Sequence, residues 1–143
     1  MTVKEYLSQA KLLDLEINER LSERSHLHDL ATRVTGTISD MPKPAGGRIT
    51  GRESVLAKLI DVERDIDAAI DRLIDLKREM TVLIERLPDR RERVVLKCRY
   101  LHNVTWASIA STLGISEAQL YRIHNDGLEK LEKIFQMRVN AIP

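Results

Sequence analysis

Between residues 116 and 125 the sequence holds polar side chains that can form hydrogen bonds with the edges of DNA bases. Arginine pairs with guanine, and glutamine or asparagine pairs with adenine, through two hydrogen bonds each. Gln119 and Arg122 are three residues apart, and Asn125 follows three residues later, so all three lie on one side of a helix. This spacing predicts a helix that presents polar groups to a groove of DNA.

Apolar residues on the opposite side of the same stretch would hold such a helix against a core. They are Leu120, Ile123 and Leu131. Ser116 can cap this helix, and Thr105 can cap a shorter helix before it. Gly114 tolerates the left-handed backbone that ends a helix, so a tight turn is expected there. The order helix, turn, helix predicts a helix-turn-helix, whose second helix enters the major groove.

The candidate DNA contacts are of three kinds. These are outward side chains of the helix after Ser116, the two capping residues beside phosphate, and basic residues of an earlier helix that begins near Pro88, the third helix of the chain. They are Thr105, Ser116, Glu117, Gln119, Tyr121, Arg122, Asn125, Arg91, Lys97 and Arg99. Trp106 is interpreted mainly as packing for the turn. Pro88 is expected in the first turn of the third helix, where its missing N–H costs little.

From Leu87 to Leu131 the chain resembles region 4 of the sigma-70 factors of bacterial RNA polymerase. The matching residues are Leu87, Pro88 and Asp89; Arg99, Tyr100 and Leu101; Thr105, Trp106, Ile109 and Ala110; Leu113, Gly114, Ile115 and Ser116; and Leu128, Lys130 and Leu131. This resemblance implies binding to promoter-like double-stranded DNA and a surface for RNA polymerase. Two positions depart from the family, since Asp126 stands where a basic residue is common and Gly127 replaces a small alanine. Gly127 either weakens the helix or permits close helix approach.

The whole chain resembles the small phage and prophage late-gene regulators called ArpU-like or RinA-like. No segment of the first 87 residues resembles the aromatic-rich strand-melting region of a sigma factor. The expected function is therefore a sequence-specific transcription regulator, encoded by a phage or prophage, that acts as an activator or adaptor to RNA polymerase.

Two long helices, over residues 3–39 and 52–87, are predicted in front of this domain. The apolar seam of the second follows alternating steps of three and four residues, the spacing of a coiled coil. Its positions are Val55, Leu59, Val62, Ile66, Ala69, Leu73, Leu76, Met80, Leu83 and Leu87. Residues 40–51, with two prolines and three glycines, are expected to be a flexible connection. Similar lengths favour an antiparallel pairing of the two helices.

The predicted fold is therefore all-α: a long antiparallel coiled-coil hairpin over residues 1–87, then a helix-turn-helix domain over residues 88–143. Five further apolar residues of the second helix lie beside its seam and would meet either the C-terminal domain or a second copy of the chain. These candidate oligomerisation residues are Leu56, Ile60, Ile70, Ile74 and Ile84. A homodimer is expected.

Composition and motifs argue against several other classes. Residues 88–143 hold nine Lys and Arg against six Asp and Glu, so the positive charge lies in the half with the predicted DNA-binding domain. The sequence has no phosphate loop, nucleophile elbow or metal-binding histidine pair, so no enzyme, cofactor or metal is expected. Its four histidines are expected to be solvated. One cysteine and no apolar span predict a cytoplasmic protein without a membrane segment.

Two alternatives from other classes share the same elements. A phage DNA-packaging subunit of the small terminase type also joins a helix-turn-helix to helical oligomerisation segments. A structural coiled-coil protein would use its helix-turn-helix to bind another protein. Oligomer size separates the first alternative from a regulator, because a dimer supports regulation and a large ring supports packaging.

Overall fold

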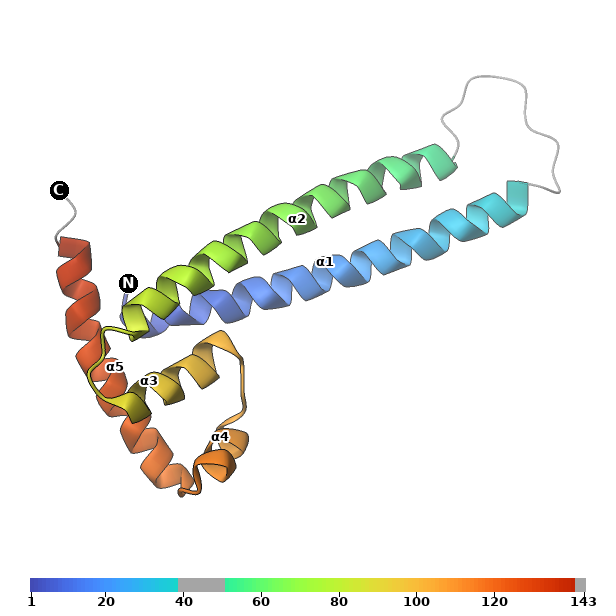
Figure 1. The fold of residues 1–143 in the computed structure, drawn as a ribbon. Helices are drawn as coiled ribbons and strands as arrows, with labels where there is room; N and C mark the ends of the chain where they lie inside the picture. The colour runs from blue at the N-terminus through green and yellow to red at the C-terminus, as the bar shows by residue number, and fades with distance from the viewer. Residues whose placement is uncertain (39–50, 141–143) are drawn as a thin grey trace. The chain divides into compact units, whose positions relative to one another are not determined.

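The computed structural model describes residues 1–38 and 51–140, with side chains placed in residues 1–33 and 51–140, and these residues are mostly helical. The elements are α1 (Val3–Ile38), α2 (Gly51–Ile84), α3 (Arg90–Leu96), the π-helix η1 (Lys97–Leu101), α4 (Trp106–Leu113) and α5 (Glu117–Asn140) (Figure 1). Within the described ranges no strand occurs, so the predicted all-α class is confirmed. The predicted connection at 40–51 lies outside the described residues, apart from Gly51, where α2 begins.

The chain divides into two compact units, and the division differs from the predicted boundary after residue 87. Unit 1 comprises Met1–Leu13 together with Leu73–Pro143, and unit 2 comprises Asp14–Arg72. The beginning of α1 and the end of α2 thus belong with the C-terminal helices. The reason is a shared core, in which Leu7 of α1 and Leu83 of α2 pack in one cluster with Leu131 of α5.

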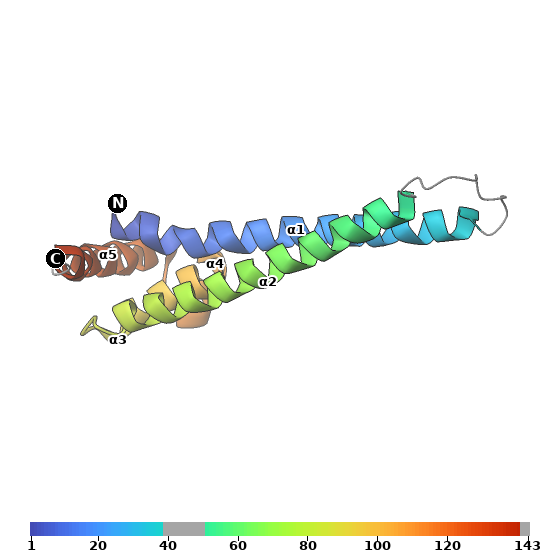
Figure 2. The same ribbon diagram turned by 90° about the horizontal axis from the view of Figure 1, so that it is seen from above.

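Unit 2 is built on one apolar interface between α1 and α2, which lie next to each other in Figure 1 and cross in the view of Figure 2. Leu27 of α1 is buried in a cluster with Leu59, Val62 and Ile66 of α2. One ion pair and one histidine–carboxylate contact border this interface. Arg20 lies 3.0 Å from Asp65, and Nε2 of His28, eight residues later in α1, lies 3.9 Å from the carboxylate of Glu63.

The predicted seam of α2 agrees well with the observed burial. Seven of its ten positions are buried, and the other three are half-buried. The half-buried positions are Val55, Leu73 and Leu76. The alternating spacing thus identified the contact face of α2 because two facing helices bury one stripe each.

The core of unit 1 draws apolar side chains from α1, α2, α3, η1 and α5. Its fully buried members include Leu7, Met80 and Ile84, and Phe135 stacks on Tyr6 with ring centroids 5.2 Å apart. Ile84 corrects one prediction. It was grouped with the oligomerisation residues, but it is 0% exposed within the chain and cannot meet a second copy.

The first residues of α1 are held in place by hydrogen bonds. The backbone N–H of Glu5 donates to the Thr2 hydroxyl, and the N–H of Thr2 donates to the Glu5 carboxylate, so the two residues form a reciprocal cap. The backbone N–H of Val3 donates to the carboxylate of Glu132 in α5 at 2.6 Å. This contact attaches the start of α1 to α5 within unit 1.

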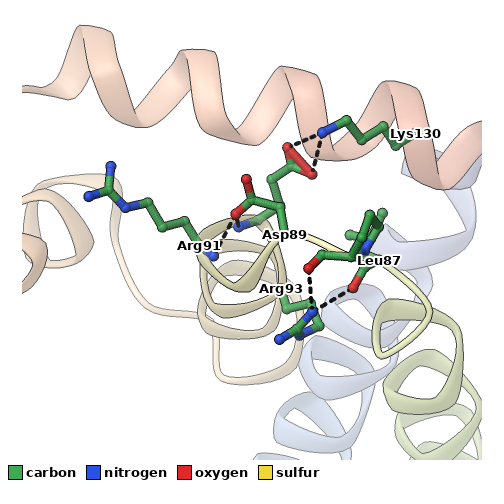
Figure 3. A network of polar contacts seen from close by, with 7 residues as sticks. Leu87, Asp89, Arg91, Arg93 and Lys130 are labelled. Carbon is green, nitrogen blue, oxygen red and sulfur yellow. Dashed lines mark hydrogen bonds and ion pairs between the residues drawn. The ribbon is translucent and has the colours of Figure 1, made fainter.

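The start of α3 departs from the prediction for Pro88. Asp89 is the N-cap, since its carboxylate accepts hydrogen bonds from the N–H groups of Arg91 and Glu92, so Pro88 precedes the helix and does not lie in its first turn. The guanidinium of Arg93 donates to the carbonyl oxygens of Leu87 and Pro88 (Figure 3). These bonds fix the chain between α2 and α3.

A close approach between α3 and α5 explains the glycine at position 127. A Cβ atom added there would lie 3.2 Å from Cβ of Glu92 and 3.4 Å from a methyl of Leu96. The carboxylate of Glu92 is buried and accepts a hydrogen bond from Lys130 at 2.9 Å. Of the two interpretations of Gly127, close helix approach is therefore the one that the packing bears out.

Candidate functional site

The predicted cap of α4 is present. The Thr105 hydroxyl accepts a hydrogen bond from the N–H of Ser108 at 3.2 Å, and its backbone is extended as an N-cap requires. Ile109 and Ala110 are the buried residues of this helix and pack with Val95 of α3 and Leu120 of α5. The short helix α4 is thus fixed between α3 and α5.

A tight turn joins α4 to α5. Gly114 has a φ of 66°, in the left-handed region that glycine adopts without strain. The N–H of Ile115 donates to the carbonyl of Ala110, which satisfies an acceptor at the end of α4. Ile115 is half-buried in the cluster under the turn.

Two of the candidate contact residues bind each other at the start of α5. The Ser116 hydroxyl accepts from the N–H of Gln119, and the Gln119 side-chain oxygen accepts from the N–H of Ser116, both at 3.2 Å. This is a capping box, a Ser followed three residues later by Gln. The side-chain oxygen of Gln119 is therefore already used, whereas its NH₂ group remains as a donor.

The first turns of α5 have two distinct faces. Leu120, His124 and Gly127 are buried at spacings of four and three. The opposite side is exposed and consists of Glu117, Ala118, Gln119, Tyr121, Arg122, Asn125 and Asp126. All five candidate contacts predicted for the outward side of this helix lie on that exposed face.

A shallow hollow of about 220 Å³ brings three of the candidate residues together. It is lined by Arg91 of α3, Gln119 and Arg122 of α5, and by Ile115, Ile123 and Asp126. Two arginines from different helices thus meet beside the start of α5. Asp126, the acidic departure from the sigma-like pattern, shares the hollow with them.

Two other basic candidates have partners within the chain. Lys97 forms an ion pair with Glu85. The guanidinium of Arg99 lies over the Trp106 ring, 4.6 Å from its centroid, and donates to the carbonyl of Val104. These contacts give both side chains a role in packing around η1. Neither residue lines the hollow at Arg91.

Trp106 is at the centre of an aromatic group, as its interpretation as packing for the turn predicted. Its ring lies 5.0 Å from that of Tyr121 and 4.7 Å from that of His124, in the second case edge to face. Tyr121 remains 41% exposed. Its ring therefore both supports Trp106 and faces outward from α5.

His124 contradicts the expectation that the histidines are solvated. It is 4% exposed, and its Nε2 lies 2.8 Å from the hydroxyl of Tyr100. Burial lowers the pKa of His124 from its ordinary value, and the charges of Lys4 and Arg99 lower it further. The signal was available in the sequence, because His124 falls four residues after Leu120 on the buried face.

The described part of the chain offers neither a metal site nor a membrane span. Among residues 1–38 and 51–140, no group of three or more His, Cys, Asp or Glu is placed to hold a metal ion. No helix in these ranges is both long enough and apolar enough to cross a bilayer. Cys98 is a half-buried free thiol.

The chain belongs to a family described as protein of unknown function DUF1492, whose model matches residues 34–132. The matched range includes α2, α3, η1, α4 and most of α5. No curated protein and no solved structure matches the chain. The family assignment therefore carries no activity with it.

Proposed function

We propose that this protein is a sequence-specific regulator of transcription that binds double-stranded DNA through α4 and α5. In this proposal α4, the turn at Gly114 and α5 form a helix-turn-helix, and α5 is the helix that enters the major groove. The observation that carries the proposal is the exposed polar face at the start of α5, supported from behind by Leu120 and His124.

The side chains of this face differ in what they can recognise. Arg122 is free of ion pairs among the described residues and can donate two hydrogen bonds to guanine. Asn125 can pair with adenine. Gln119, while its oxygen accepts from Ser116, offers only its NH₂ donors, so it suits a base that presents acceptors such as guanine. Arg122 is therefore assigned the largest share of base recognition.

Contacts to the phosphate backbone are assigned to groups beside this helix. Arg91 shares the hollow with Arg122 and is exposed, so it can reach a phosphate while α5 lies in the groove. The first N–H groups of α4 and α5, after Thr105 and Ser116, favour negative charge. Lys97 and Arg99 have internal partners and are given the smaller part.

The long helices are assigned to self-association. In this proposal α1 and α2 form an antiparallel coiled-coil hairpin, and the chain is a homodimer. Supporting evidence is two exposed apolar pairs on one side of α2: Leu56 with Ile60, 41% and 59% exposed, and Ile70 with Ile74, 38% and 50% exposed. Isolated apolar residues on a surface are ordinary, but apolar pairs four residues apart on one side of a helix favour a partner.

Further parts of the proposal rest on the resemblance to sigma region 4 and to phage late-gene regulators. They are action as an activator or adaptor on RNA polymerase, an origin in a phage or prophage, and a place in the cytoplasm. No catalytic role is proposed for any residue.

Selection of bound sites from random duplex DNA, at two salt concentrations, tests the proposal. A regulator should enrich one sequence motif at both concentrations. Salt-sensitive binding without a motif would instead indicate the nonspecific binding of a packaging subunit. An absence of binding at low salt would contradict both and leave the structural coiled-coil alternative.

Sedimentation of the unmodified chain and of the double variant Ile70→Glu, Ile74→Glu tests the dimer. The unmodified chain should sediment as a dimer and the variant as a folded monomer. If the unmodified chain sediments as a monomer at high concentration, the proposed interface is wrong. A ring of eight or more copies would favour packaging.

A further inference from the structure

A pocket of about 240 Å³ lies in unit 1, on residues that the proposed function does not use for base recognition. Its lining comes from α1, η1, the segment after η1, α4 and α5. The residues are Lys4, Ser8, Lys11, Arg99, Tyr100, Asn103, Trp106 and His124. Every one of them belongs to unit 1, so the pocket is contained in a single compact unit.

The charge of this lining is unbalanced. Lys4, Lys11 and Arg99 are basic, and no carboxylate is present among the described residues that line the pocket. Neither lysine takes part in an ion pair with any described residue, whereas Arg99 lies over the Trp106 ring. Three positive charges around one concave space attract an anion, and the attraction grows when one side of the space is closed to water.

The local backbone is unusual where it supplies this pocket. Arg99 and Tyr100 belong to η1, whose π-type hydrogen bond runs from the N–H of His102 to the carbonyl of Lys97 at 3.2 Å. Single π-turns are rare in helices and occur often at functional sites. Asn103 has a φ of 53°, a left-handed conformation that asparagine tolerates better than most residues. Two irregular segments thus place residues at the pocket.

The neutral groups of the lining limit what can bind. The Ser8 hydroxyl donates to the carbonyl of Lys4 at 2.7 Å, so its proton is not free for a ligand. The hydroxyl of Tyr100 is paired with His124. Burial lowers the pKa of His124, and Lys4 and Arg99 contribute, which is the effect expected when positive charge near the ring is uncompensated. Recognition must therefore come mainly from the three cations.

We propose that this pocket binds a phosphate group. Lysine ammonium groups act as point charges toward phosphate oxygens, and an arginine adds a directed pair of donors. The volume is smaller than the roughly 300–1,000 Å³ typical of sites that enclose a drug-sized molecule. The pocket is therefore suited to one phosphate group, carried either by a DNA backbone that passes α4 or by a small phosphate ester.

Trp106 provides a direct reporter, since it is the only tryptophan of the chain and lines the pocket. Inorganic phosphate, added to the full chain at constant ionic strength, should change the fluorescence of Trp106 in a saturable way. Acetate at the same ionic strength is the control for charge alone and should leave the fluorescence nearly unchanged. This titration contains no DNA, so it decides the pocket even if the proposed DNA binding fails.

The test variant is Lys4→Gln with Lys11→Gln, because both side chains are exposed and their loss should not disturb the core. A unit charge at contact distance in watery surroundings is worth about a factor of five in affinity, so the loss of two charges should weaken phosphate binding about 25-fold. The matched control is Lys58→Gln with Lys133→Gln, which makes the same change of net charge at exposed positions outside the lining. It should bind phosphate as the unmodified chain does.

The source of the phosphate follows from a second measurement, the affinity for duplex DNA at several salt concentrations. If the Lys4, Lys11 variant loses affinity for all sequences and its salt slope falls by about 1, the pocket holds a backbone phosphate. If phosphate binding is lost but duplex binding is unchanged, the ligand is a free phosphate compound. Both results support the site. A Trp106 signal that is absent, that acetate reproduces, or that survives in the double variant overturns it.

Discussion

Units 1 and 2 contain similar helices but differ in what those helices bury. All five aromatic residues of the chain belong to unit 1, and so do the buried polar residues Glu92 and His124. Unit 2 buries an apolar stripe on each of its two helices, and its ion pair between Arg20 and Asp65 is formed by partly exposed side chains. The candidate chemistry is therefore concentrated in one unit.

The contrast shows what each kind of packing can support. Two facing helices need only apolar residues at the right spacing, and such an interface tolerates varied neighbours. Unit 1 instead brings six helical segments together, through contacts such as the hydrogen bond from Val3 of α1 to Glu132 of α5, the pair of Glu92 with Lys130 and the ring contacts of Trp106. Fixed positions of that kind are what recognition of another molecule requires.

The largest difference between the units is expected from core truncation. Leu131→Ala in unit 1 should lower the free energy of unfolding by about 3–5 kcal/mol, because the side chain is 0% exposed and enclosed by several helices. Leu59→Ala in unit 2 should cost less, about 2 kcal/mol, since that side chain keeps 6% of its exposure and its neighbours can close the gap. Urea unfolding followed by circular dichroism measures both. An equal or larger loss at Leu59 would contradict the comparison.

A smaller effect is expected where α3 and α5 approach each other. Gly127→Ala gains about 0.5–1 kcal/mol of helix propensity but places a methyl group 3.2 Å from Cβ of Glu92, a contact that α3 can relieve only by moving. We expect a net loss of about 1 kcal/mol in the free energy of unfolding.

The matched control for that substitution is Gly51→Ala, where an added Cβ meets no atom within 4 Å. It should leave the free energy of unfolding unchanged or slightly higher. If Gly127→Ala proved as harmless as the control, the close approach of α3 and α5 would not limit this position.

The smallest expected effect is a pH dependence specific to unit 1. Because burial lowers the pKa of His124 below 6.5, the unfolded chain takes up a proton there more readily than the folded chain. The stability contributed by the neutral ring is present above about pH 6.5 and is lost as the pH falls through the lowered folded value. His124→Gln should remove this pH-dependent contribution to the free energy of unfolding. Urea unfolding of the unmodified chain and of the variant at about pH 7.5 and about pH 5.5 should show that their free energies of unfolding differ less at the lower pH. A difference that stays constant would refute this role of His124.

Periodicity alone predicted the contact face of α2 and the all-α class. Leu59, Val62 and Ile66 are buried because one helix faces another, and that relation repeats along the sequence. The sequence also predicted the caps at Thr105 and Ser116, since each needs only a residue type and a short spacing.

Unit 1 shows where such reasoning stops. Ile84 had the same pattern as Ile74, yet one is fully buried and the other half exposed, because α3, η1 and α5 pack on one end of α2. The pocket at Lys4 and Arg99 joins residues almost a hundred positions apart, and no local spacing signals such a contact. The sequence predicts Pro88 in the first turn of the third helix, whereas Asp89 is the N-cap and the helix begins at Arg90.

Binding curves for Arg122→Ala on a selected duplex and on a scrambled duplex test the central claim that α5 recognises DNA bases. We expect a loss of about 1–3 kcal/mol on the selected duplex, relaxed preference at one base and little change on the scrambled one. Arg91→Ala is the comparison. It should weaken binding to both duplexes alike and reduce the dependence of the affinity on salt concentration. Equal losses on both duplexes for Arg122→Ala would reduce this residue to a phosphate contact. An unchanged affinity on both would contradict the assignment of α5 as the recognition helix.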